Sequence, residues 1–124
     1  MSKQEENNVA SSVSISPNVI ARSAGSATNS TLGVVGMASV DPVDGIVKLL
    51  SNDKLGKGVK VTIEEDGIII ELHIIVAFGV NIQSVAENII ENVKYKVEDF
   101  TSMTVKEINV YVEGVKIINW FYAL

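Results

Sequence analysis

The sequence contains no cysteine among its 124 residues, which excludes disulfides, thiolate metal sites and thiol catalysis. Histidine occurs once, so a zinc centre with several imidazole ligands is excluded. Basic residues are also few: 10 lysine and arginine residues stand against 15 aspartate and glutamate residues, for a net charge of −5. This balance argues against binding to nucleic acid or directly to anionic membranes, which both need clustered basic side chains.

Long hydrophobic runs are missing as well. The longest apolar stretch, Ile68 to Val80, is interrupted by Glu71 and His73 and is too short to cross a bilayer. The N-terminal stretch MSKQEENNVASS is polar and lacks the apolar core of a secretion signal. We therefore expect a cytoplasmic protein that does not insert directly into a membrane.

The composition indicates one folded domain with two short flanking segments. A hydrophobic fraction of 47% is enough for a single core in a chain of this length. Residues 1–12 are too polar to join that core and are predicted to be a disordered N-terminal lead. Residues 13–118 are predicted to form the domain, and residues 119–124 form an aromatic C-terminal tail.

The strongest pattern is a pair of alternating apolar runs that flank Asp66-Gly67 within residues 58–79. An Asp-Gly dipeptide suits a two-residue hairpin turn, because both central positions of a type I′ turn need a positive φ. One face of this hairpin is then aliphatic and the other face is mostly polar. With the turn at these two residues, the predicted pairs are Ile63 with Ile70, Val61 with Leu72, Val59 with Ile74 and Lys60 with His73.

Two amphipathic helices are predicted on either side of the hairpin. Ser16-Pro17 is typical of a helix start, and apolar residues at helical spacing continue over residues 18–29. The face predicted to be buried consists of Ile20, Ala24 and Ala27. Asn81 is a suitable cap for a longer helix over residues 82–100, whose apolar stripe recurs every three or four residues.

The remaining segments are strands and connections. Apolar patterns predict strands over residues 13–15, 34–38 and 105–117, the last with a bulge at Gly114. Residues 46–50 are expected to form one or two helical turns, and residues 52–58 a polar loop. Two amphipathic helices can hide their stripes only against the apolar face of the sheet. The predicted fold is therefore α+β: a two-layer sandwich with a mixed, mainly antiparallel sheet in the order β-α-β-β-β-α-β and both main helices on one face.

Polar clusters that could carry chemistry are sparse. Glu71, His73 and Lys60 share the polar face of the hairpin, but a solvated surface is the favoured interpretation, since zinc and catalytic sites need more convergent ligands. Asp41 and Asp44 could hold a cation weakly, yet both are turn formers and no calcium-loop spacing follows. We predict no catalytic residues, no cofactor and no metal.

Three apolar residues, Ile69, Ile75 and Ala77, interrupt the polar face of the hairpin. They form a candidate interaction surface together with Tyr111 and the tail residues Trp120, Phe121 and Tyr122, because aromatic residues are enriched at interface hot spots. The alternative is that the tail folds over this face and covers it within the same chain. Both interpretations stay open at this point.

Five segments, taken in order, resemble the alkaline shock protein family and in particular its short single-domain members. They are ISPNVIARSAGSAT (residues 15–28), GVVGMAS (33–39), GVKV (58–61), DGIIIELHIIVAFGVNIQSVAENIIENVKYKVE (66–98) and VKEINVYVEGVKI (105–117). The set is specific although no single motif is, and it covers residues 15–117. The end of the tail lies outside the region of resemblance.

The resemblance implies a bacterial protein tied to envelope stress, cytoplasmic and without catalytic residues to carry over. Some members lie at the inner face of the membrane through a membrane-anchored partner, and short members often sit in operons beside a dihydroxyacetone-kinase-like protein of lipid metabolism. Our leading hypothesis is a non-catalytic scaffold or adaptor, acting as a homo-oligomer or by docking a membrane-anchored or kinase-like protein. The second hypothesis is a regulatory or small-molecule (acyl-binding) accessory subunit of such a kinase-like enzyme.

Overall fold

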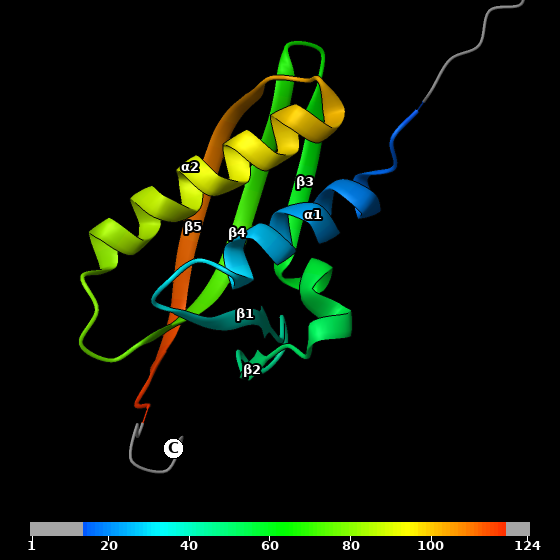
Figure 1. Cartoon of the computed structure of the whole chain (residues 1–124). Coiled ribbons are helices and arrows are strands. Elements are labelled where there is room, and N and C mark those ends of the chain that lie inside the picture. The colour runs from blue at the N-terminus through cyan, green and yellow to red at the C-terminus, as the bar shows by residue number, and fades with distance from the viewer. Residues whose placement is uncertain (1–13, 119–124) are drawn as a thin grey trace, which may run out of the picture.

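The computed structural model describes residues 14–118, which form two helices packed on one face of a sheet (Figure 1). The elements follow in the order α1 (Pro17–Asn29), β1 (Val34–Val40), β2 (Val47–Leu49), the 3-10 helix η1 (Asn52–Gly58), β3 (Val59–Glu64), β4 (Gly67–Ala77), α2 (Ile82–Thr101) and β5 (Val105–Lys116). The α+β class with a mixed sheet and both main helices on one face is confirmed.

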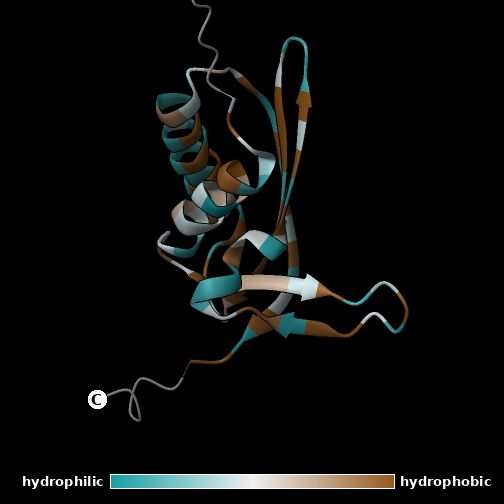
Figure 2. Ribbon diagram, turned by 90° about the vertical axis from the view of Figure 1, so that its right-hand side faces the viewer, coloured by the Kyte–Doolittle hydropathy of each residue, from teal (hydrophilic) through white to brown (hydrophobic). Residues whose placement is uncertain are grey.

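Strand β4 is the centre of the sheet, because it pairs with three other strands. Leu72 faces Val59 of β3 on one edge and Val110 of β5 on the other edge. The edge of β4 that pairs with β3 continues past the end of β3 and there pairs with β1. Strand β2 pairs with the other edge of β1. The pairing of β4 with β5 is parallel and the other three pairings are antiparallel. Figure 2 shows that the arm made by β1 and β2 projects away from the helices.

The core lies between β4 and the two helices. The inward side chains of β4 are Ile68, Ile70, Leu72, Ile74 and Val76, and all are fully or almost fully buried. They pack against Ile20 and Ala24 of α1 and against a buried stripe on α2, which consists of Val85, Ile89, Val93 and Val97. Burial of this single face removes most of the large aliphatic side chains from water, and the hydrophobic effect therefore joins the two layers.

The structure corrects the predicted register of the hairpin. The turn consists of Glu65 and Asp66, so that Glu64 pairs with Gly67 and Ile63 pairs with Ile68. The predicted turn at Asp66-Gly67 is therefore wrong by one residue, and every predicted partner is displaced by two. A displacement of two residues preserves the faces, because side chains alternate with period two.

Gly67 belongs to the strand because β5 begins directly against it. Ile68 N donates a hydrogen bond to Thr104 O at 2.8 Å. A Cβ atom on Gly67 would lie 2.7 Å from that same carbonyl oxygen, closer than van der Waals contact allows. The glycine is thus required by its own φ of +156°, which residues with a side chain rarely adopt, and by a tertiary contact with residue 104 that was not visible in the local pattern.

Both helices begin where the sequence predicts. Ser16 Oγ accepts a hydrogen bond from Asn18 N at 3.1 Å, and Pro17 is the first residue of α1. Asn81 Oδ1 accepts a hydrogen bond from Ser84 N at 2.9 Å at the start of α2. The predicted strand over residues 13–15 is different: Ser14 and Ile15 lie in no strand, and Val13 lies outside the described residues. Ile15 instead packs against the core from the chain that leads into α1.

Residues 41–58 also differ from the prediction. Residues 47–49 form β2 and not a helical turn, because Leu49 and Lys48 pair with Ala38 and Ser39 of β1. The reversal between the strands is held by the Asp41 and Asp44 side chains, which accept hydrogen bonds from backbone N–H groups. Residues 52–58, predicted as a loop, form η1. It packs against α1, where a Cβ on Gly25 would lie only 3.0 Å from Leu55 O.

Replacement of Gly67 by alanine is expected to destabilise the protein more than the same change at Gly45. Gly45 has φ of +72°, but a Cβ atom added there meets nothing within 4 Å, so Gly45→Ala adds only backbone strain of roughly 1–2 kcal/mol. Gly67→Ala adds the clash with Thr104 O and is expected to cost roughly 3 kcal/mol, the upper range for overpacking. Urea unfolding measures both, and equal losses would contradict the assigned role of Gly67.

Candidate functional site

The face of the sheet opposite the helices is the candidate interaction surface, and we call it the open face. Its side chains alternate with the core residues along β4 and β5. They are Ile69, Glu71, His73, Ile75 and Ala77 of β4 and Asn109, Tyr111 and Glu113 of β5. The β4 members are all half-buried and Tyr111 is exposed. No helix of residues 14–118 packs over this face, as Figure 2 shows.

The centre of the open face is a cluster of polar side chains that contact one another. His73 Nδ1 lies 2.5 Å from Glu113 Oε2, and His73 Nε2 lies 3.9 Å from Glu71 Oε2. The Tyr111 ring stacks on the imidazole with a centroid separation of 5.0 Å and an interplanar angle of 12°. The histidine is therefore held between two carboxylates and covered on one side by an aromatic ring.

This cluster differs from the one expected from the sequence. Lys60 faces Glu71 and not His73, because the hairpin register is displaced by two residues. Glu113, which contacts His73, comes from 40 residues further along the chain and reaches it through parallel strand pairing. The bulge at Gly114, which is confirmed, shifts the register between Ile74 and Ile75 and places Glu113 beside the imidazole. Local alternation carries no signal for such a contact.

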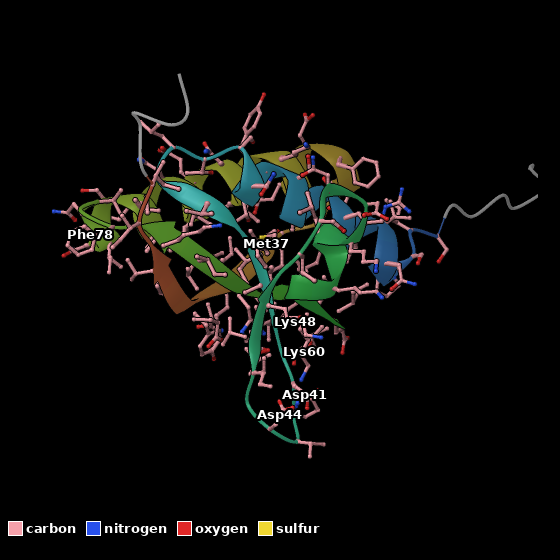
Figure 3. All side chains as sticks on the ribbon, turned by 90° about the horizontal axis from the view of Figure 1, so that it is seen from below. Met37, Asp41, Asp44, Lys48, Lys60 and Phe78 are labelled. Carbon is pink, nitrogen blue, oxygen red and sulfur yellow. The ribbon has the colours of Figure 1, made fainter. Side chains whose placement is uncertain are left out.

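The polar residues of the open face do not assemble a metal site. Across residues 14–118 no group of three or more histidine, aspartate or glutamate side chains is arranged to hold a metal ion. The hollow beside His73, lined by Ala38, Ser39, Val40 and Lys57, measures about 170 Å³, below the usual size of a ligand pocket. Asp41 and Asp44 act as turn formers at the far end of the β1–β2 arm (Figure 3).

The predicted apolar residues lie at the two ends of this polar centre. Ile75 faces Gly114 across the strand pair, so no cross-strand side chain covers it, and Ala77 follows on the same side. Ile69 lies at the other end of β4, roughly 20 Å from Ile75 at the usual rise of a strand. Tyr111 stands between them, opposite His73. Trp120, Phe121 and Tyr122 lie outside the described residues.

A second polar cluster, which sequence reasoning missed, joins β5 to the tip of the hairpin. Lys106 Nζ donates hydrogen bonds to Asp66 Oδ1 and to Glu64 Oε1, each at 2.9 Å. Two hydrogen bonds raise the pKa of Lys106 well above its ordinary value: the bond to Asp66 has the larger effect and the bond to Glu64 the smaller one. In turn, the hydrogen bond from Lys106 lowers the pKa of Asp66. The groups are exposed, so this cluster adds little stability.

Sequence reasoning also missed a groove on the helix side, between α1, η1 and α2. It measures about 750 Å³ and its walls are amphipathic. Val19, Leu55 and Phe100 supply apolar surface, Arg22 and Lys96 supply positive charge, and Asp53 supplies one carboxylate. Arg22 also borders an adjoining groove of about 430 Å³ lined by Lys54 and Lys57. Three elements far apart in sequence form this groove, so no single sequence motif predicts it.

No helix among residues 14–118 is both long and apolar enough to cross a membrane.

Comparison with known proteins finds bacterial relatives over most of the chain. A family model for alkaline shock protein 23, described as having a cell envelope-related function, matches residues 5–117. The chain is 39% identical over 108 residues to the uncharacterized protein YloU of Bacillus subtilis, covering 86% of this chain and 90% of that protein. It is 35% identical over 107 residues to the uncharacterized protein Spy1614 of Streptococcus pyogenes, covering 86% and 88%. No solved structure is significantly similar to the chain.

Replacement of Tyr111 by alanine is expected to lower the free energy of unfolding by about 1 kcal/mol, because the stacked contact with His73 is lost. Tyr95→Ala on the solvent side of α2 is the matched control, and its effect is expected to stay within about 0.5 kcal/mol. Urea unfolding of both variants gives the comparison. Equal effects would show that the ring stack adds no stability.

Proposed function

This chain belongs to the alkaline shock protein 23 family, whose function is related to the cell envelope, and we propose that it serves there as a non-catalytic scaffold or adaptor. It acts by self-association or by docking a protein partner. The observation that carries this proposal is the open face, on which Ile69, Ile75 and Tyr111 lie under no helix of the described chain. A sheet face of this kind gains stability when a partner covers it.

The composition of the open face supports a binding role. Aliphatic side chains flank a polar centre with two carboxylates and one imidazole, so a partner that covers it is expected to supply a basic or hydrogen-bond-donating group. Tyr111 combines a large ring with a hydroxyl group, which is typical of interface hot spots. The strands hold these side chains in place, which lowers the entropic cost of binding.

The surroundings of His73 support a structural role for the cluster. A general base must present a free ring nitrogen to its substrate, within hydrogen-bond distance of the proton that it removes. His73 Nδ1 is hydrogen-bonded to Glu113, Tyr111 stacks on the ring, and no nucleophile or metal-ligating group of residues 14–118 is arranged around the imidazole. The cluster therefore serves to hold β5 against β4 at the centre of the docking surface.

The partner is proposed to be a second copy of the chain or a protein at the envelope. In the second case the protein is cytoplasmic and reaches the inner face of the membrane through a membrane-anchored or kinase-like partner. Both proposed partners bind the open face, so one substitution on this face tests self-association and partner docking together.

Ile75→Glu is expected to reduce self-association and partner capture by at least tenfold, because a buried, unpaired carboxylate at an interface costs more than about 1.4 kcal/mol. Light scattering gives the solution mass, and affinity capture from the bacterial membrane fraction gives the bound partners. The matched control is Ile90→Glu, which makes the same chemical change on the exposed side of α2 and is expected to leave both readouts unchanged. Identical masses and identical partners for wild type and Ile75→Glu would refute the proposal.

The second candidate function is a regulatory, acyl-binding subunit of a kinase-like enzyme of lipid metabolism. The amphipathic groove between α1, η1 and α2 favours it, since its volume of about 750 Å³ is within the range of ligand pockets. Apolar walls beside Arg22 and Lys96, which outnumber the single carboxylate of Asp53, favour a ligand with a hydrocarbon chain and an anionic head.

The doubly substituted variant Arg22→Glu/Lys96→Glu is expected to weaken binding of a medium-chain alkyl phosphate by at least tenfold, because each change reverses a charge that faces the anionic head. Isothermal titration calorimetry measures the affinity. Lys94→Glu, a charge reversal on the same helix outside the groove, is the control and should bind as wild type does. Absence of binding to the wild-type protein would remove this candidate and leave the scaffold proposal intact.

A further inference from the structure

A second exposed apolar surface lies away from the open face, where β4 and β5 end. We call it the apolar corner, and its residues come from three segments of the chain. They are Leu32 from the α1–β1 connection, Phe78 and Ile82 from the β4–α2 connection and the first residue of α2, and Val115 and Ile117 from the end of β5 and the residue after it. Leu32 is 90% exposed, Ile117 76% and Phe78 72%.

Backbone hydrogen bonds hold the three segments of the apolar corner together. Ala77 N donates to Gly33 O at 3.0 Å, and Phe78 N donates to Lys116 O at 2.9 Å. Gly33 packs so closely that a Cβ atom there would lie 2.7 Å from Val85 Cγ2. The apolar corner is therefore a preformed surface on a fixed backbone, and Figure 3 shows Phe78 at the edge of the molecule.

The layer of helices ends before β5 does. In Figure 1, α2 crosses β5 obliquely and the last residues of the strand run beyond the helix. The exposed fraction along the helix side of β5 rises accordingly, from 36% at Val112 to 54% at Val115 and 76% at Ile117. At the other end of the strand, beneath α2, Val105 is buried. The apolar corner is the part of the core-facing surface that no described element covers.

We propose that residues 119–124 of the same chain cover the apolar corner, with Trp120, Phe121 and Tyr122 packed on Phe78, Leu32 and Ile117. The segment NWFYAL follows the last described residue, Ile118, and thus starts at this surface. It contains three aromatic residues and no charged side chain. Asn119 is a residue type that favours a chain reversal at the point where the segment must turn back.

The length of residues 119–124 and their effective concentration both favour this segment, rather than a second copy of the chain, as the group that covers the apolar corner. Six residues span up to roughly 20 Å when extended, enough to cross the apolar corner. A segment tethered this closely has an effective concentration on the order of millimolar, which exceeds the concentration of a second copy in dilute solution. The open face is not involved, so this contact is independent of the proposed scaffold function.

Trp120 is the single tryptophan of the chain, so its fluorescence reports directly on the tail. In the wild-type protein its emission is expected to be blue-shifted relative to the urea-unfolded chain and independent of protein concentration. The double variant Leu32→Ser/Phe78→Ser removes two of the most exposed corner residues and is expected to shift emission to the red and to raise acrylamide quenching at least twofold. Tyr95→Ser, an equally exposed aromatic on α2 at 74%, is the matched control and should leave emission unchanged.

Circular dichroism establishes that each variant is folded, and a chain ending at Ile118 gives a second readout. Without the tail, this chain is expected to bind more of the dye ANS than the full-length protein does, and the two serine substitutions should abolish the increase. Wild-type emission equal to that of the unfolded chain would overturn the proposal, as would emission unaffected by the corner substitutions. Emission that shifts to the blue as concentration and solution mass rise would overturn it too, because the occupant would then be a second copy.

Discussion

Burial of one face of β4 is the constraint on which the rest of the structure depends. Five aliphatic side chains of this strand are removed from water by α1 and α2, and both edges of the strand are satisfied by backbone pairing. The helices can occupy only the apolar side of the sheet, since their stripes find no comparable surface elsewhere. Within residues 14–118, the opposite face of the same strand is consequently left without a covering layer. The fold and the candidate interaction surface thus have one cause.

The open face and the apolar corner, which no element of residues 14–118 covers, differ in construction. The open face has a fixed polar centre, in which His73 is held by Glu113 and stacked on Tyr111, with aliphatic side chains beyond it. Such a surface suits a partner that matches both its charges and its shape. The apolar corner has no comparable polar centre and is continuous with the core. It suits a short apolar segment, and the chain supplies one within reach. Assignment of a different occupant to each surface follows from this chemistry.

The polar clusters show what strand pairing across long sequence separations contributes. The contact of Lys106 with Asp66 and Glu64 and the contact of His73 with Glu113 both join β5 to the hairpin. Each contact forms only in the observed register of β5 and would be lost on a slip of two residues, which preserves the faces of the strand. The polar groups of the open face therefore help to specify the register, whichever partner binds there.

The sequence by itself determined the α+β class, the starts of both helices, the faces of the hairpin and the placement of Ile69, Ile75 and Ala77 on the outer side. These features depend on periodicity and capping, which act between residues a few positions apart. The tertiary structure alone decided the hairpin register, the strand at residues 47–49, the partner of His73 and the amphipathic groove. Gly67 illustrates the reason: its local context favours a turn, but the carbonyl of Thr104 occupies the space of its missing side chain. Contacts of this kind join residues that are distant in sequence, and only the folded chain brings them together.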